Sequence, residues 1–177
     1  MDHFLEEVVV KKKNTSNRIL YYFSWFVLIT SALMAVFQIQ FLFLQFDLYT
    51  LITTVILAAI AILTFLYHDR LLTEYEYTFT NGSLDFAEVY NNKKRRSLGS
   101  LNVRTVDSFG KVNSGAFKRY LNTPDVKRMN WFLNRDAELY YFYFSKDSNK
   151  KMIILEPSEE MVGMIKNYLP RGVYQEN

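Results

Sequence analysis

The chain has 177 residues, of which 22% are charged and 50% hydrophobic, and its formal net charge is +3 at pH 7. This length accommodates one ordinary domain and a short additional module. Cysteine is absent, which excludes disulfides, thiolate metal sites and a cysteine nucleophile. Charge is unevenly distributed, because Asp47 is the single charged residue between Ile19 and Tyr67. The composition therefore separates an apolar N-terminal part from a charged C-terminal part.

Two uncharged runs, Ile19–Phe37 and Leu48–Tyr67, are 19 and 20 residues long. A bilayer core of about 30 Å requires about 20 apolar residues as helix, so each run predicts a spanning helix. The segment Gln38–Asp47 contains three Gln and one Asp and predicts a turn with a short interfacial stretch. We therefore expect a two-helix transmembrane hairpin over residues 19–67. A buried hairpin in a soluble protein and a cleaved signal peptide are the weaker alternatives.

Lys and Arg residues flank this hairpin and do not occur in its connection. The positive-inside rule then predicts two spans of the plasma membrane with both termini in the cytoplasm. On the second helix Thr54, Ala58 and Ala61 share one face, which indicates close helix packing within the hairpin, in a homo-oligomer or with a partner helix. Neither run contains an ionisable residue, which disfavours transport.

The segment after the hairpin is predicted to form mainly β-strands. Thr73–Thr80 alternates polar and apolar residues, Asn81-Gly82 is a strong hairpin signal, and Ser83–Tyr90 returns with Leu84 and Phe86 inward. Further strands are predicted as one long or two short segments within 98–112 and over 126–133, 138–145 and 151–155, with a basic loop at 91–96 and the least ordered stretch at 113–125.

The C-terminal residues change to a helical period. Pro157 is suited to a first helical turn, and Pro170 ends the pattern. The apolar stripe that packs on the sheet consists of Met161, Met164, Ile165, Tyr168 and Leu169. We thus expect an α+β chain with an N-terminal cytoplasmic segment (1–18), the hairpin (19–67) and a β domain (68–177) of about seven antiparallel strands capped by one helix.

This order resembles the pleckstrin-homology-like (PH-like) barrel or sandwich. More specifically, the chain resembles a family of small membrane proteins from Gram-positive anaerobes with two transmembrane helices before a PH-like domain. The resemblance covers nearly the whole chain and implies no assigned activity and no functional residues. It rests on Lys11-Lys12-Lys13, the segment Glu74–Gly82, Lys93–Arg96, the segment Glu156–Met161 and Tyr168-Leu169-Pro170.

The sequence contains no Gly-rich phosphate loop, nucleophile elbow or paired metal-binding histidines. The carboxylate pairs Glu74 with Glu76 and Asp136 with Glu138 are spaced as on the solvent face of a strand, whereas general acid–base work also needs burial or a partner, and the neighbouring sequence indicates neither. His3 and His68 lie in flanking segments and are expected to be solvated or at the level of the headgroups. We therefore predict no catalytic residues, no metal site and no cofactor.

A basic stretch from Lys93 to Arg128 has ten Lys or Arg against two acids, a balance of +8. One interpretation is a set of solvated loop residues that also determine topology. The alternative is contact with anionic headgroups, worth about 1 kcal/mol per basic residue near the surface. For that contact the candidates are Lys93, Lys94, Arg95 and Arg96. Few aromatic residues are interleaved, so nucleic acid is not an expected partner.

These features favour a non-enzymatic, membrane-anchored binding or scaffold module at the inner face of the plasma membrane. Its partners would be the bilayer, anionic headgroups and an unidentified protein. The alternative is a regulatory subunit of a larger membrane complex, held through its hairpin.

Overall fold

The computed structural model describes residues 3–12, 15–146 and 149–175. The chain divides into two compact units. One unit joins the N-terminal segment, up to Lys12, with the chain from Glu74 onward. The other comprises the intervening residues up to Thr73.

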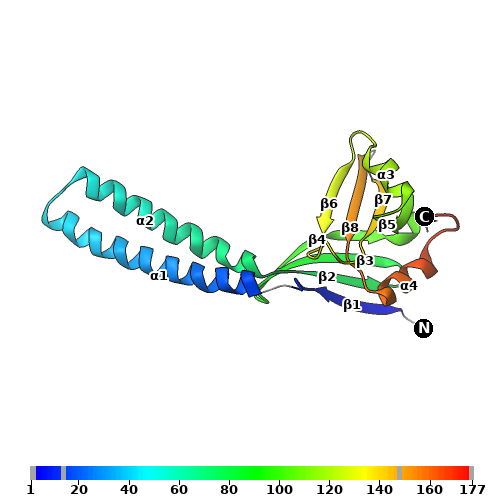
Figure 1. Ribbon diagram of the computed structural model, residues 1–177, viewed down its shortest axis with the longest axis horizontal. Coiled ribbons are helices and arrows are strands. Elements are labelled where there is room, and N and C mark those ends of the chain that lie inside the picture. The colour runs from blue at the N-terminus through cyan, green and yellow to red at the C-terminus, as the bar shows by residue number, and fades with distance from the viewer. Residues whose placement is uncertain (1–2, 13–14, 147–148, 176–177) are drawn as a thin grey trace. The chain divides into compact units, whose positions relative to one another are not determined.

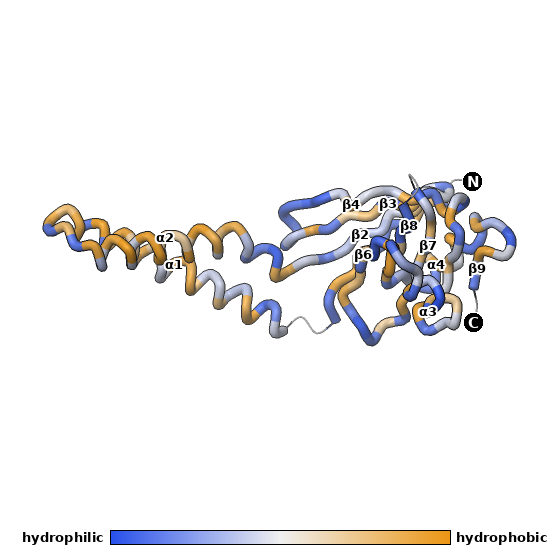
Figure 2. The backbone as a smooth tube through the Cα atoms, turned by 90° about the horizontal axis from the view of Figure 1, so that it is seen from above, coloured by the Kyte–Doolittle hydropathy of each residue, from blue (hydrophilic) through white to orange (hydrophobic). Residues whose placement is uncertain are grey.

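The intervening unit is a helical hairpin of α1 (Thr15–Leu44), α2 (Leu48–Tyr67) and the 3-10 helix η1 (His68–Leu72). Both long helices are apolar (Figure 2) and long enough to cross a membrane. Helix α2 has the predicted bounds. Helix α1 instead continues to Leu44, so the prediction of a connection beginning at Gln38 was wrong.

The continuation of α1 has a local explanation. Residues 38–44 contain no Gly or Pro, and Gln is a good helix former. Gln38 is bonded within the hairpin, because its Oε1 accepts from the hydroxyls of Thr53 (3.1 Å) and Thr54 (2.9 Å) of α2. The connection therefore shrinks to residues 45–47, and Asp47 caps the start of α2 by accepting from the Thr50 backbone N–H at 2.8 Å.

The other unit contains two sheets, two helices and a 3-10 turn (Figure 1). Sheet A has the order β1-β2-β3-β4, with β1 Phe4–Val9, β2 Thr73–Thr80, β3 Ser83–Tyr90 and β4 Lys94–Asn102. Sheet B has the order β6-β8-β7-β5-β9, with β5 Ser108–Lys111, β6 Lys127–Trp131, β7 Tyr140–Lys146, β8 Asn149–Leu155 and β9 Tyr174–Gln175. The remaining elements are η2 (Val103–Thr105), α3 (Gly115–Leu121) and α4 (Glu159–Tyr168).

Strand β1 comes from the segment expected to lie outside the β domain. It pairs antiparallel with β2 over six residues, from Phe4 opposite Thr80 to Val9 opposite Tyr75. Val9 is 5% exposed. The helical hairpin is therefore inserted in the sequence between two neighbouring strands of one sheet, and the β domain is built from both sides of it.

A buried asparagine holds the chain just after β1. The Asn134 side chain accepts from the Lys12 backbone N–H at 2.8 Å and donates to the Val10 carbonyl at 3.0 Å. Asn134 also donates to Glu156 at 2.8 Å, and the same carboxylate accepts from the Asn134 backbone N–H at 3.0 Å. Asn134 is 6% exposed, so these bonds satisfy a polar group that would otherwise be costly to bury. We name this arrangement the Asn134 clasp.

Two tight turns build the β2–β3–β4 meander. The predicted Asn81-Gly82 turn joins β2 to β3 and has positive φ at both residues. A second turn places Asn91 and Asn92 at φ of 50° and 53°, as type I′ hairpins require. It is closed by the Lys93 N–H donating to the Tyr90 carbonyl at 3.0 Å. The predicted loop at 91–96 was therefore too long, because β4 already begins at Lys94.

The main core lies between sheet A, sheet B and α4. The inward prediction for Leu84 and Phe86 is confirmed, since they are 0% and 2% exposed. The apolar stripe of α4 packs on the same core, with Ile165 fully buried. Ser158 caps this helix by accepting from the Met161 N–H at 3.1 Å, so the helix starts two residues later than Pro157. Two sandwiched, mostly antiparallel sheets with a C-terminal helix confirm the predicted PH-like α+β class.

Helix α3 covers the outer face of sheet B and was not predicted. Phe117 of α3 packs with Tyr141 and Met152 in a second apolar cluster. Ser114 starts the helix by accepting from the Phe117 N–H at 3.2 Å. The stretch 113–125, expected from sequence to be the least ordered, thus contains a helix that is capped by Ser114. Both faces of sheet B are covered as a result, which explains why β7 and β8 are apolar on both sides.

Candidate functional site

The candidate headgroup-binding residues lie at the β3–β4 turn. Lys93 ends the turn, and Lys94, Arg95 and Arg96 open β4, the edge strand of sheet A. All four are exposed. The two positive-φ asparagines fold the chain back sharply, so four consecutive cations are presented at one tip of the sheet.

The charge of Arg95 is neutralised within the domain. Arg95 donates from Nε to Glu76 of β2 at 2.5 Å, and this side chain is 59% exposed. Arg96 lies opposite Glu88 in the β3–β4 register, and Glu88 accepts from the Tyr90 hydroxyl at 2.5 Å. The Arg95 guanidinium thus has a fixed carboxylate partner. Replacing Arg95 would also break its bond to Glu76. Charge is therefore better removed from the turn by changing Lys93, Lys94 and Arg96.

The position of this turn in the sheet is its most informative property. In an antiparallel meander, the end of β1, the start of β2 and the β3–β4 turn all lie at the same end of the sheet (Figure 1). Val9 lies opposite Tyr75 there, and Tyr90 lies opposite Lys94. We call this the connector end of sheet A, because both chain segments that lead to the helical hairpin leave from it.

The rest of the basic stretch does not join the turn. Arg104 lies near the opposite end of sheet A, with its guanidinium 5.0 Å from the ring centroid of Tyr168. Lys111 forms an ion pair with Glu138, which holds the pKa of that carboxyl below its ordinary value. The other four basic residues lie on α3 and β6. A run that is continuous in sequence is therefore divided among four places in the fold.

The predicted helix-packing face lies within the hairpin. Thr54 is the buried residue of α2, and Ser31 and Ala35 are the buried residues of α1. Ala58 and Ala61 are half-buried. Because Thr54 donates to Gln38 of α1, the polar group on this face is bonded inside the same chain.

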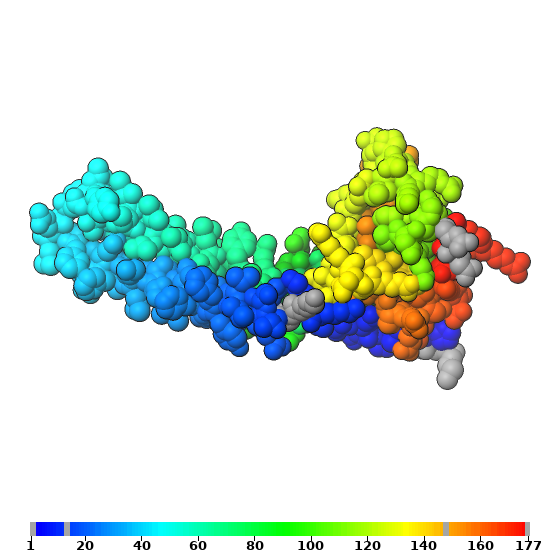
Figure 3. Space-filling model, in the orientation of Figure 1, coloured from blue at the N-terminus to red at the C-terminus, as the bar shows by residue number. Residues whose placement is uncertain are grey.

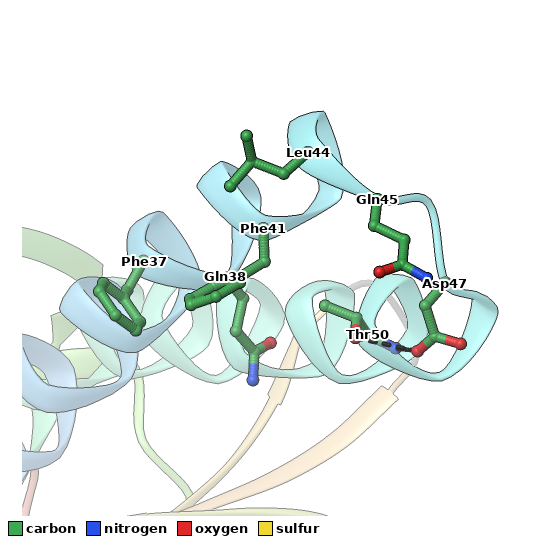
Figure 4. A pocket seen from close by; sticks show the side chains of 7 residues that line it. All are labelled: Phe37, Gln38, Phe41, Leu44, Gln45, Asp47 and Thr50. Atoms are coloured by element: carbon green, nitrogen blue, oxygen red, sulfur yellow. Dashed lines mark hydrogen bonds between the residues drawn. The ribbon is translucent and has the colours of Figure 1, made fainter.

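A hollow of about 760 Å³ lies at the connecting end of the hairpin (Figure 4). Asp47 on its rim accepts from both the backbone N–H and the hydroxyl of Thr50, at 2.8 and 2.9 Å, so it caps a helix. The wall combines apolar and amide groups with this Asp47–Thr50 cap: Phe37, Gln38, Phe41, Leu44, Gln45, Asp47 and Thr50 line it.

Of the two alternatives expected for the histidines, the solvated one does not apply to His68. His68 is 6% exposed, and its ring packs against Tyr21 and Trp25 with centroid distances of 5.7 and 5.0 Å. Its Nδ1 donates to the Phe65 carbonyl at 2.8 Å. The imidazole thus ends α2 as a packed side chain. His3 is exposed and contacts Tyr168 edge-on, at 5.7 Å between centroids.

No catalytic constellation assembles in the described part of the chain. Burial raises the pKa of Tyr77, whose hydroxyl is bonded to the Trp131 carbonyl, so this phenol stays protonated. Within residues 3–12, 15–146 and 149–175, no group of three or more His, Asp or Glu side chains could hold a metal ion. The geometry offers surfaces for binding.

The comparison with protein families gives one match. The family model described as Bacterial PH-like domain (DUF6106) matches residues 1–175, nearly the whole chain. The match includes the N-terminal strand and both apolar helices together with the sandwich. No curated protein and no solved structure matches the chain. The chain therefore belongs to the Bacterial PH-like domain family.

Proposed function

We propose that the protein is a non-enzymatic binding module, anchored by its helical hairpin, whose PH-like domain lies in the cytoplasm against the inner leaflet of the plasma membrane. In this proposal the β3–β4 turn contacts anionic headgroups. The observation that carries it is the location of this turn at the connector end of sheet A, the end from which the chain leads to the hairpin.

The short connectors support the proposal. Helix α2 and strand β2 are separated by the five residues of η1, which reach at most about 18 Å even if fully extended. Strand β1 ends at Val9, and α1 begins at Thr15. Because the connectors are this short, the connector end stays within reach of the bilayer surface.

The pairing of β1 with β2 supports the predicted topology. These strands lie on opposite sides of the hairpin in sequence, yet they pair over six residues. Such pairing requires both segments to be in the same compartment, as two spans predict. The positive-inside rule favours the cytoplasm, because Lys and Arg flank the hairpin and do not occur between its two runs.

The energy of the contact is modest. Each basic residue near an anionic leaflet contributes about 1 kcal/mol, so Lys93, Lys94 and Arg96 together give at most about 3 kcal/mol, which is weaker than millimolar binding by a free domain. A tethered domain needs no larger binding free energy, since the hairpin already keeps it at the surface. Headgroup contact would therefore orient the domain rather than recruit it.

The test uses the absence of native cysteine. The full-length protein, labelled with a fluorophore at Ser97→Cys on β4, is placed in nanodiscs that carry a headgroup-attached quencher, with or without anionic lipid. Thr80→Cys, at the other end of β2, is the matched control position. We expect quenching at position 97 that requires anionic lipid and fades with salt.

Changing Lys93, Lys94 and Arg96 together to Gln should remove this quenching while leaving the fold intact. Equal quenching at positions 97 and 80, or no effect of the triple change, contradicts headgroup contact by the turn.

A further inference from the structure

Sheet B has a second basic surface that the proposed leaflet contact does not use. Its members come from α3, the start of β6 and the start of β8. The parallel β6–β8 register places Lys127 beside Lys151. Arg128 donates to the Leu121 carbonyl at 2.5 Å, which brings the end of α3 to the same place. We call this surface the cationic end of sheet B: Lys118, Arg119, Lys127, Arg128, Lys150 and Lys151.

These charges are not neutralised by the domain itself. In the part of the chain that the structure describes, none of the six forms a salt bridge with an acid. Asp125 lies in the turn before β6, and Asp107 accepts from Ser145 of β7 at 3.3 Å. Asp147 lies outside the described residues. By sequence the six cations still outnumber these three acids.

The β6–β8 register places two of these like charges next to each other. Lys127 and Lys151 are Cα partners on adjacent strands, so two like charges lie side by side. Like charges in this position destabilise a sheet. An anionic group bound across the pair would relieve that repulsion.

The chemistry of the surface narrows the class of partner. Every large hydrophobic residue found exposed among the described residues lies at or before Tyr67. The cationic end thus offers neither an apolar wedge for a bilayer nor an exposed ring for stacking on nucleic-acid bases. Recognition here depends on charge and hydrogen bonds, as in the pairing of Lys and Arg with carboxylates.

The position of the surface within the domain separates it from the β3–β4 turn. Strands β6 and β8 run across the direction of β2 and β3 (Figure 1), so the ends of the two sheets lie on different sides of the domain. In Figure 3 the yellow-green atoms of the α3–β6 segment form the upper end of this unit. If the connector end contacts the leaflet, the cationic end of sheet B stays accessible from the cytoplasm.

We propose that the cationic end of sheet B docks an acidic, carboxylate-rich segment of a protein partner. The inference rests on the proposed function, because the leaflet contact leaves this surface free. A Glu- or Asp-rich chain in extended form places carboxylates on both sides of its backbone. Lys127 and Lys151 alternate onto the face of sheet B that carries Ile153, whereas Arg128 and Lys150 alternate onto the face that α3 covers. An extended acidic segment that passes across the end of the sheet can therefore contact both sets of cations.

The experiment uses the full-length protein in nanodiscs of zwitterionic lipid. The probe is a fluorescent peptide that alternates Glu with Ser, and the matched peptide has Gln in place of Glu. We expect the Glu peptide to bind in a salt-dependent way. Changing Lys127, Lys150 and Lys151 together to Gln should weaken binding about tenfold, equivalent to about 1.4 kcal/mol.

The matched control removes the same charge from the connector end. The triple change of Lys93, Lys94 and Arg96 to Gln should leave peptide affinity within about twofold of the unmodified protein, a change of about 0.4 kcal/mol. Equal losses from both triple variants would mean that net charge alone binds the peptide, and equal binding of the Gln peptide would remove the role of charge. Either result overturns the proposal.

Two further outcomes would assign the surface to another partner class. An oligonucleotide of equal charge that binds more tightly, with the same sensitivity to the sheet B variant, would indicate nucleic acid. Loss of leaflet quenching in anionic nanodiscs on the sheet B change would indicate lipid. Failure of the proposed leaflet contact would be seen in a different measurement. That measurement is the quenching experiment with the connector-end variant, which uses no peptide.

Discussion

Strand β1 should carry a large part of the stability of the β domain, although it precedes the helical hairpin in sequence. The test removes β1 and compares two soluble proteins, one with this strand and one without it. In the first, residues 3–12 are joined to residues 73–175 by a short Gly/Ser linker in place of the hairpin. In the second, residues 73–175 are expressed alone. A short linker suffices, because Val9 and Tyr75 are direct neighbours in the sheet.

The expected loss in the free energy of unfolding follows from the side chains that β1 buries. A fully buried Val contributes about 1.5–3 kcal/mol, and Val9 is 5% exposed, while Leu5 packs partly against the same core. The strand hydrogen bonds and the Asn134 clasp add about 0.5–1.5 kcal/mol each in net terms. After the entropy of ordering about ten residues is subtracted, we expect a net loss of about 3–5 kcal/mol on removal of β1. A domain of this size is stable by only about 5–15 kcal/mol.

Urea unfolding of both proteins provides the assay. Trp131 is the single tryptophan of the domain and packs against Phe86, at 4.6 Å between ring centroids, so its fluorescence reports on the core. The joined protein should unfold cooperatively, and the protein without β1 should unfold at much lower urea or be unfolded without it. The point change Asn134→Ala in the joined protein should cost about 1–3 kcal/mol through the lost clasp. Equal urea midpoints with and without β1 would refute the reasoning.

Two further predictions concern the C-terminal half. Ile165→Asp should unfold the joined domain, because an unpaired charge would replace a fully buried side chain on α4. The control is Lys166→Asp, a change at the exposed neighbouring position. Similar urea midpoints for the two variants would show that α4 does not pack as described. The Lys111–Glu138 ion pair depresses the Glu138 pKa, so its contribution should be present above the ordinary Glu pKa and be lost as pH falls through the depressed value. NMR titration should show this pKa rising in Lys111→Gln, and an unchanged titration curve would contradict the pairing.

Much of the fold could be predicted from local patterns. The bounds of α2, the Asn81-Gly82 hairpin and the stripe of α4 each depend on residues close together in sequence. Such elements can be predicted from the length of an uncharged run, from the residues of a turn and from the helical period of apolar residues. Their agreement with the structure shows that local preference and tertiary packing coincide there.

The missed elements depend on distant contacts or on ambiguous residues. Strand β1 has no strict alternation, and its partner β2 begins 64 residues after it ends, so its pairing cannot be recognised locally. Helix α3 is short and begins with Ser-Gly, which suits a loop as well as a cap. The Asn91-Asn92 turn was included in a longer loop because basic residues follow it. The division of the basic stretch among four places likewise follows from topology, which spacing in the sequence does not reveal.

The most direct test of the account is the membrane topology of the full-length protein in cells. Single cysteines at Gln45→Cys in the connection of the hairpin and Asn149→Cys at the start of β8 can be introduced into a chain that has no cysteine. An impermeant thiol reagent should label position 45 in intact cells and position 149 only after permeabilisation. Labelling of position 149 from outside, with position 45 protected, would contradict a module anchored at the inner face of the membrane.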